Sequence, residues 1–128
     1  MAKIFANPTV TVNNVPVVPK PNSTSIVEGK GEKTVKGVSA GAGFSDIVIS
    51  EDISTKISKI KFSIPSNDVN YSLVRAWQAI DLNLGNVVTV HEDDYAAVMT
   101  GGIVINDPEK MFGVDEYFEV EFHGRPIV

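Results

Sequence analysis

The fold of this chain is decided by residues 54–84, which read STKISKIKFSIPSNDVNYSLVRAWQAIDLNL. Ile60, Phe62 and Ile64 alternate there with polar side chains, which is the period of a strand with one buried face. Pro65 cannot donate to a β-ladder, and the Ser-Asn-Asp that follows offers side-chain oxygens to the first N–H groups of a helix. The stretch therefore predicts a strand, a sharp turn and an amphipathic helix.

The predicted helix covers about residues 67–81, because apolar side chains recur there at spacings of three and four, and Gly85 is placed to end it. This apolar stripe consists of Val69, Leu73, Ala76, Trp77, Ile80 and Leu84. We expect Leu73, Trp77 and Ile80 to anchor the helix on one side or end of a sheet built from the short alternating runs elsewhere.

Length and composition are those of one globular domain spanning residues 1–128. The chain is 43% hydrophobic and 21% charged, and its apolar runs are shorter than the ~18 residues of a membrane span. The start, MAKIFANP, lacks the continuous apolar stretch of a signal peptide, so we expect synthesis and retention in the cytoplasm. The absence of Cys excludes a disulfide framework, a thiolate nucleophile and a Cys-bound metal centre.

Acidic residues outnumber basic ones. Sixteen Asp and Glu against eleven Lys and Arg give a net charge of −5 and a pI near 4.9. This balance argues against nucleic-acid binding by phosphate neutralisation. The acidic excess is most simply a feature that keeps the protein soluble.

Two features are expected in the first third of the chain. Residues 9–18 read as a hairpin turning at Asn13-Asn14, whose second arm, rich in Pro, belongs at a sheet edge. Residues 24–38 read as one long polar strand with charged side chains on one face, among them Glu28 and Glu32. Its two Gly residues indicate either bulges or close approach to another backbone.

An extended Gly-rich loop is predicted over residues 39–46. The small residues at its tip are followed by one large aromatic side chain, whose exposure to water is unfavourable. The loop is therefore either a mobile hairpin tip or a loop that contacts a partner, which would cover the aromatic side chain. Both readings stay open at this point. The candidate interface residues are Ser39, Ala40, Gly41, Ala42, Gly43 and Phe44.

The last third of the chain is predicted to be β again. Residues 87–105 read as a hairpin around the acidic turn Glu-Asp-Asp, and residues 116–123 give a closing strand. In that strand Phe118, Val120 and Phe122 point inward, whereas the side chains between them point outward.

No catalytic, metal or cofactor motif is found. His91 and His123 lie far apart in sequence at strand ends, and the acidic turn lacks the ligand spacing of a calcium loop. The Gly-rich segments lack the GK[ST] of a phosphate loop, and no nucleophile-elbow motif is present. We therefore expect no enzyme, no metal and no cofactor.

The order of these segments resembles that of tail tube proteins of contractile-tailed bacteriophages. The segments that carry the resemblance are TVTVNNVPVVP, SIVEGKGEKTVKG, the Gly-rich loop, SEDISTKISKIKFSIPSNDVNYSLVRAWQAI and EYFEVEFHGRPI. The resemblance implies a mostly β, α+β fold in which two packed antiparallel sheets form a β-sandwich or barrel flanked by one helix.

The resemblance also implies a function. Hexameric rings would stack into the hollow inner tail tube of a virion, assembled in the host cytoplasm, through which DNA passes without specific binding. The implied partners are further copies of the chain, the tail sheath, the tape measure protein and tail-end proteins, with no membrane. Negative charge facing the lumen would keep DNA sliding, and the candidates are Glu28, Glu32, Glu119 and Glu121.

Two alternatives remain. A tube protein of type VI secretion shares the architecture. A monomeric carbohydrate-binding β-sandwich belongs to a different class and would show a row of exposed aromatic side chains, for which Tyr71, Tyr95 and Tyr117 are available.

Overall fold

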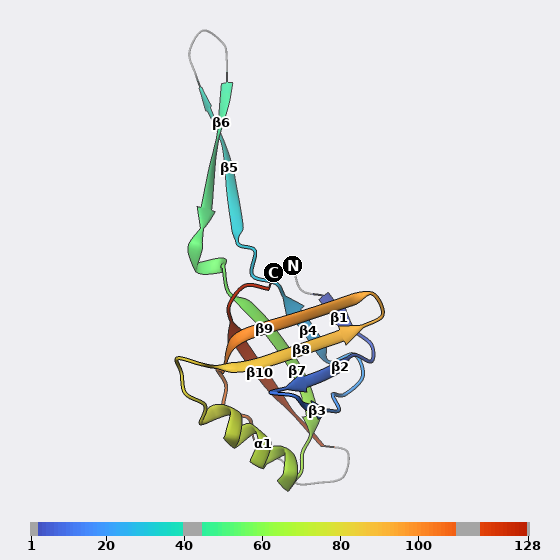
Figure 1. Cartoon of the computed structure of the whole chain (residues 1–128). Helices are drawn as coiled ribbons and strands as arrows, with labels where there is room; N and C mark the ends of the chain where they lie inside the picture. The colour runs from blue at the N-terminus through green and yellow to red at the C-terminus, as the bar shows by residue number, and fades with distance from the viewer. Residues whose placement is uncertain (1–2, 40–44, 110–115, 128) are drawn as a thin grey trace.

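The computed structural model describes residues 3–39, 45–109 and 116–127, in which strands dominate and one α-helix is present (Figure 1). The mostly β, α+β class expected from the sequence is confirmed. The strands are β1 (Lys3–Phe5), β2 (Thr9–Val12), β3 (Val15–Val17), β4 (Thr24–Val27), β5 (Glu32–Ser39), β6 (Ser45–Asp52), β7 (Ser58–Pro65), β8 (Asn86–Glu92), β9 (Tyr95–Val104) and β10 (Tyr117–Gly124). The helices are a 3₁₀ turn (Ile53–Thr55) and α1 (Asp68–Gln78).

Eight strands form one antiparallel sheet in the order β1-β4-β7-β10-β9-β8-β2-β3, and β5 and β6 form a second sheet by themselves. The ladder between β10 and β9 is short, with the rungs Phe122↔Val104 and His123↔Ile103. The large sheet folds over at this point, so that β1-β4-β7-β10 and β9-β8-β2-β3 pack on each other as a sandwich. The described strands do not close into a barrel, because the end strands β1 and β3 are not paired with each other.

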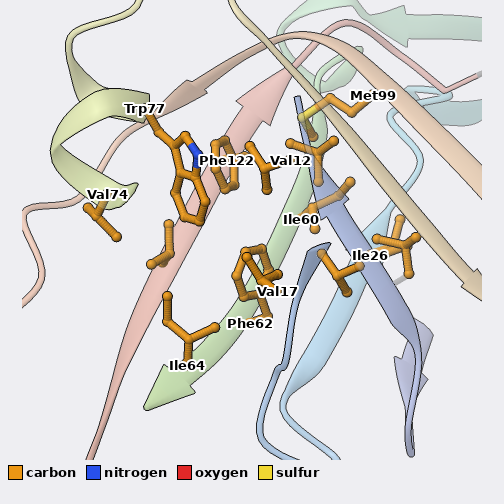
Figure 2. Packing of buried hydrophobic residues seen from close by; sticks show 14 of the residues in the cluster. Val12, Val17, Ile26, Ile60, Phe62, Ile64, Val74, Trp77, Met99 and Phe122 are labelled. Carbon is orange, nitrogen blue, oxygen red and sulfur yellow. The ribbon is translucent and has the colours of Figure 1, made fainter. Parts of the chain in front are cut away.

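The ladder between β7 and β10 supplies one side of the core. Its register pairs Ile60 with Phe122, Phe62 with Val120 and Ile64 with Phe118, and these side chains are at most 4% exposed. The alternation read from the sequence is confirmed for both strands. The facing half contributes the buried side chains Val10, Val12, Val17, Val88, Val90, Ala97 and Met99 (Figure 2).

Helix α1 begins as predicted but is shorter than expected. Asn67 is its N-cap and accepts a hydrogen bond from the Asn70 backbone N–H at 2.9 Å. The helix ends at Gln78 with Ala79 as its C-cap, not near residue 81. Gly85 does not end the helix; it lies in a separate turn and donates its backbone N–H to the Asp81 carbonyl at 2.8 Å.

The predicted apolar stripe of the helix is only partly right: Trp77 is buried and Leu73 packs against the core, but the stripe as a whole does not face the sheet. The buried residues are Tyr71, Val74 and Trp77, whereas Val69 and Leu84 are 70% and 71% exposed. Ring contacts explain this rotation. The centroid of Tyr71 lies 5.0 Å from that of Phe118. The centroid of Trp77 lies 5.6 Å from that of Phe122, and Figure 2 shows these two rings next to each other. The two large rings therefore set which side of the helix faces the sheet.

The three residues expected to anchor the helix differ in how deeply they are buried. Trp77 is 3% exposed and belongs to the core. Leu73 is only partly buried but packs against the core, and Ile80 is half-buried after the helix has ended.

Asn86, at the start of β8, is a fully buried polar residue that fastens the end of the helix. Its side-chain Nδ2 donates to the carbonyl oxygens of Trp77 and Gly102, at 3.0 Å each. Its Oδ1 accepts a hydrogen bond from Asn13 Nδ2 at 2.9 Å. One side chain thus joins the helix, the β9 strand and the turn of the N-terminal hairpin.

The N-terminal hairpin has the expected form. Asn13 and Asn14 adopt positive φ angles of 53° and 67° between β2 and β3, and β3, which carries Pro16, is an end strand of the sheet. The single strand predicted over residues 24–38 is wrong, because the chain breaks after β4 and starts β5 only at residue 32.

Gly29 explains that break. Its φ is +79°, and a Cβ there would lie 2.5 Å from the backbone carbonyl carbon of Ile57. Close approach to another backbone was one of the two readings of these glycines, and it is the one found at Gly29.

Trp77→Ala should lower the free energy of unfolding by about 3–5 kcal/mol, a large part of the stability of a small domain. The physical reason is the cavity left against Phe122. Urea unfolding followed by far-ultraviolet circular dichroism measures the loss. Val69→Ala, on the exposed side of the same helix, is the matched control and should change stability by less than about 0.5 kcal/mol. Equal losses in the two variants would contradict the assigned helix face.

Candidate functional site

The most distinctive surface of the molecule is the ribbon formed by β5 and β6, residues 32–52, which we call the arm. It extends away from the eight-stranded body (Figure 1). Neither arm strand pairs with any other described strand, and no described arm residue belongs to the hydrophobic core. The arm therefore presents both edges and both faces.

The register of the arm separates its side chains into two chemically different faces. On one face Val35 pairs with Ile49, and Ile47 lies opposite Gly37. These three apolar side chains are 59–61% exposed, and we call the surface that they form the apolar arm face. The charged pair Lys33 and Glu51 lies on the same side, at the base of the arm. The opposite surface, the polar arm face, carries Thr34, Lys36, Val48 and Ser50.

The base of the arm is braced by hydrogen bonds from the 3₁₀ turn. The backbone N–H of Glu32 donates to Thr55 Oγ1 at 2.6 Å, and that hydroxyl donates to the Asp52 carbonyl at 2.6 Å. Lys56 Nζ lies 2.7 Å from Glu51 Oε1, and this hydrogen bond lowers the pKa of the Glu51 carboxyl. The ion pair is exposed and adds little stability, but with the hydroxyl bonds it limits how the arm is directed.

A second set of contacts holds the chain where it leaves the body for the arm. The Glu28 carbonyl accepts the Ile127 backbone N–H at 2.8 Å. The Glu28 carboxylate accepts the Tyr95 hydroxyl at 3.0 Å and lies 3.4 Å from Lys30 Nζ. Burial, followed by this bond to Glu28, raises the pKa of Tyr95 to about 12. The root of the arm is thus tied to β9 and to the C-terminal segment.

A hollow of about 390 Å³ lies at the same root. Its lining includes Glu28, Lys30, Glu32, Thr55 and Lys59, so both signs of charge are present. The Glu28 carboxylate is already engaged by Tyr95 and Lys30. The hollow lies at the junction between the arm and the body.

The four predicted lumen acids do not form one group. Glu119 and Glu121 lie on the outer side of β10, Glu32 is the first residue of the arm, and Glu28 is turned towards Tyr95 on the other half of the sandwich. The structure therefore brings together only Glu119 and Glu121.

Those two acids belong to an outer surface that we call the charged face, formed by β7 and β10. The register places Lys61 opposite Glu121 and Lys59 opposite His123. Glu121 also contacts His123. Two lysines thus accompany the two glutamates, and the acidic excess of the chain does not reside on this face.

The outer surface of β3, β2, β8 and β9 is different. Paired rungs align Pro16, Thr11, Thr89 and Val98 in one row, and Thr9, His91 and Ala96 in the next. None of these residues is Asp, Glu, Lys or Arg. We call this surface the Thr/Val face; Val98, on β9 at one end of the first row, is 51% exposed.

The predicted interface loop is shorter than expected. Ser39 is the last residue of β5 and pairs with Ser45, so residues 45 and 46 already belong to β6. The other candidates, Ala40, Gly41, Ala42, Gly43 and Phe44, lie outside the described residues.

The apolar arm face was missed in the sequence because its residues come from two segments that were considered separately. Residues 32–38 were assigned to the end of the strand predicted over residues 24–38, and no pairing with residues 46–52 was predicted. Pairing the two segments across the Gly-rich turn would have placed Val35 and Ile49 on one side.

The described residues contain neither a cluster of metal-binding side chains nor a membrane-spanning helix. In the described ranges 3–39, 45–109 and 116–127, no group of three or more His, Asp or Glu side chains is placed to hold a metal ion. In the same ranges, no helix has the length and apolar character needed to cross a bilayer.

Comparison with known proteins gives no relative: no family model, no curated protein and no solved structure matches the chain.

The Tyr95 hydroxyl should ionise at a higher pH than that of an ordinary tyrosine. Glu28→Gln should lower the pKa of Tyr95 from about 12 towards the ordinary value of 10.0. The amide keeps an acceptor for the hydroxyl but removes the negative charge that opposes the tyrosinate. Absorbance of tyrosinate during alkaline titration measures this, and Glu119→Gln, on the charged face, is the control that should leave the curve unchanged.

The same shift predicts a loss of stability in alkali. The folded pKa of Tyr95 is raised, so its contribution is fully present below pH 10 and is lost as the pH rises through about 12. Superimposable titrations of wild type and Glu28→Gln would contradict the bond between Glu28 and Tyr95.

Proposed function

We propose that this chain is the structural subunit of a bacteriophage tail tube, in which hexameric rings stack into a hollow conduit for DNA. The observation that carries the proposal is the arm. It is a long antiparallel ribbon whose apolar side chains find no cover in their own body. The segment order described for the sequence supplies the choice of family.

A ribbon of this kind gains from a neighbour. A two-stranded ribbon without a core is marginally stable in water, and its open edges can pair with other chains. Three apolar side chains at 59–61% exposure on one face add an unfavourable contact with water. Assembly with further copies removes these costs and gives each copy a defined place.

The arm is also suited to repeated assembly. Contact between an arm and a different surface of another copy is heterologous, and such contacts generate rings when they close and filaments when they do not. Rings that stack into a tube use both outcomes. By the same resemblance, the assembled tube would contact a tail sheath, a tape measure protein and tail-end proteins, and would reside in the virion after assembly in the host cytoplasm.

The arm and the three tyrosines bear on the two alternative functions. A secretion tube of type VI would use the arm in the same way. A carbohydrate-binding β-sandwich is disfavoured because Tyr71 is 7% exposed and stacked on Phe118, and the Tyr95 hydroxyl is bound to Glu28. Tyr117 lies beneath the Lys20 ammonium at 5.2 Å, so the three tyrosines do not form an exposed row.

The purified wild-type chain should form rings or tubes as its concentration rises, and a variant without the arm should not. Replacing residues 33–51 by Asn-Gly joins the paired residues Glu32 and Asp52 through a two-residue hairpin turn. We expect this variant to fold, because no described arm residue is in the core, and to stay monomeric. Electron microscopy and sedimentation velocity measure assembly, and the unfolding midpoint is the control. Tubes formed by the armless variant would contradict the role of the arm.

DNA should pass the tube wall without binding, and one substitution should change that. The charged face holds two lysines and two glutamates, so it offers phosphates no cluster of cations. Glu119→Lys leaves one glutamate beside three lysines on that face. If this face lines the lumen, tubes of the variant should retain duplex DNA at low salt and release it as salt rises. Ser25→Thr, on the neighbouring strand β4, is the neutral control. Wild-type tubes that retain DNA as strongly as the variant would contradict a non-binding wall.

A further inference from the structure

We propose that the apolar arm face of one copy packs on the Thr/Val face of the body of a second copy. This inference rests on the proposed function and names the surface that the arm meets. It commits to a self-contact whose two halves are both present in this chain: Val35, Ile47 and Ile49 on the arm, and the rows around Thr89 and Val98 on the body.

Charge decides between the two outer faces of the body. Packing Val35, Ile47 and Ile49 on β7 and β10 would take Lys59, Lys61, Glu119 and Glu121 out of water against side chains that offer neither donors nor acceptors. The charged pair on the same arm face, Lys33 and Glu51, lies at the base of the arm, where Glu51 is already bound by Lys56. The Thr/Val face has no such cost. Its threonine methyl groups and Val98 offer apolar atoms to the arm, and covering an uncharged hydroxyl costs less free energy than covering an unpaired charge.

The arm is not placed to cover the Thr/Val face of its own chain. It leaves the body at the end where β4 and β7 meet it and extends outward (Figure 1). The hydrogen bond from the Glu32 N–H to Thr55 and the ion pair of Lys56 with Glu51 oppose folding back. At Gly29 the chain already touches the backbone of Ile57. The apolar arm face is therefore free for another copy.

The size of the contact explains why it would act in an assembly rather than in a pair. Eight residues per strand span roughly 26 Å, and a two-stranded ribbon is roughly 10 Å wide, so one face covers roughly 250 Å². Counting both partners, the contact buries roughly 500 Å², well below the 1,200–2,000 Å² of a stable interface. One arm alone holds weakly. Copies that each give an arm and receive another accumulate contacts as a ring closes.

The absence of cysteine from the natural sequence permits a direct test by cross-linking. A full-length chain with Ile49→Cys is mixed with a tagged full-length chain with Val98→Cys, and a short bismaleimide is added. Each chain carries a single thiol, so any product that joins tagged to untagged chain is intermolecular. We expect this hybrid to form several-fold more efficiently than in the matched controls.

Two controls isolate the faces. Ser50→Cys replaces the arm residue next to Ile49 but lies on the polar arm face, and it should cross-link poorly to Val98→Cys. Ser63→Cys lies on the charged side of the body, opposite Glu119, and should cross-link poorly to Ile49→Cys. If Ser50→Cys reacts as well as Ile49→Cys, the arm joins by its edges and the proposed face contact is overturned. If Ser63→Cys reacts as well as Val98→Cys, the body surface is wrongly assigned.

Sedimentation velocity of the lysine variants separates this inference from the proposed function. Ile49→Lys should abolish assembly and leave the unfolding midpoint unchanged, whereas Ser50→Lys should assemble as the wild type does. If the wild type assembles and both variants do so equally, the face contact is overturned and the tube proposal stands. A wild-type chain that remains monomeric at every concentration contradicts both.

Discussion

The ladder between β7 and β10 is the contact on which the rest of the molecule depends. Its register runs from the pair of Ser58 and Gly124 to that of Pro65 and Tyr117, and its inner face pairs an aliphatic with an aromatic side chain at almost every buried rung. The helix starts just beyond the end of β7, the arm returns to the body just before its start, and β10 passes to the second half of the sandwich through β9. A change of one residue in this register would turn Ile60, Phe62 and Ile64 to the solvent and remove every one of these attachments.

Local chemistry in the sequence was enough to predict those elements whose partners are fixed by alternation or by a cap. The strands around Phe62 and Val120 were recognised because each has a single buried face. The helix start was recognised because the short polar side chains of residues 66–68 can satisfy the free N–H groups of a first turn, and Asn67 is the one that caps it. The helix face was not predictable in this way. Its orientation is decided by Phe118 and Phe122, which are distant in sequence and attract the rings of Tyr71 and Trp77.

The candidate site depends even more on tertiary information. Glu28 reads as one of a row of exposed charges, but the break at Gly29 turns its carboxylate to Tyr95. Val35 reads as a lone apolar residue in a polar strand, and it becomes part of a surface only through its pairing with Ile49. The uncharged rows of the Thr/Val face come from two hairpins, β2–β3 and β8–β9, that are distant in the chain, so no periodicity within one segment reveals them. For these reasons the apolar arm face and the Thr/Val face can be recognised only once the register between strands is known.

Asn86 gives the body an all-or-none character. Its amide is fully buried, and its three hydrogen bonds reach Trp77, Gly102 and Asn13, which belong to the helix, to β9 and to the N-terminal turn. Any partly folded form that buries Asn86 while one of these segments is absent leaves a polar group without a partner, at a cost of about 1–3 kcal/mol. Such half-formed states are therefore penalised relative to both the complete body and the open chain, which sharpens the folding transition. The body therefore forms as one unit, whereas the described strands of the arm have neither core residues nor ladder partners in the body and stand outside this cooperative unit.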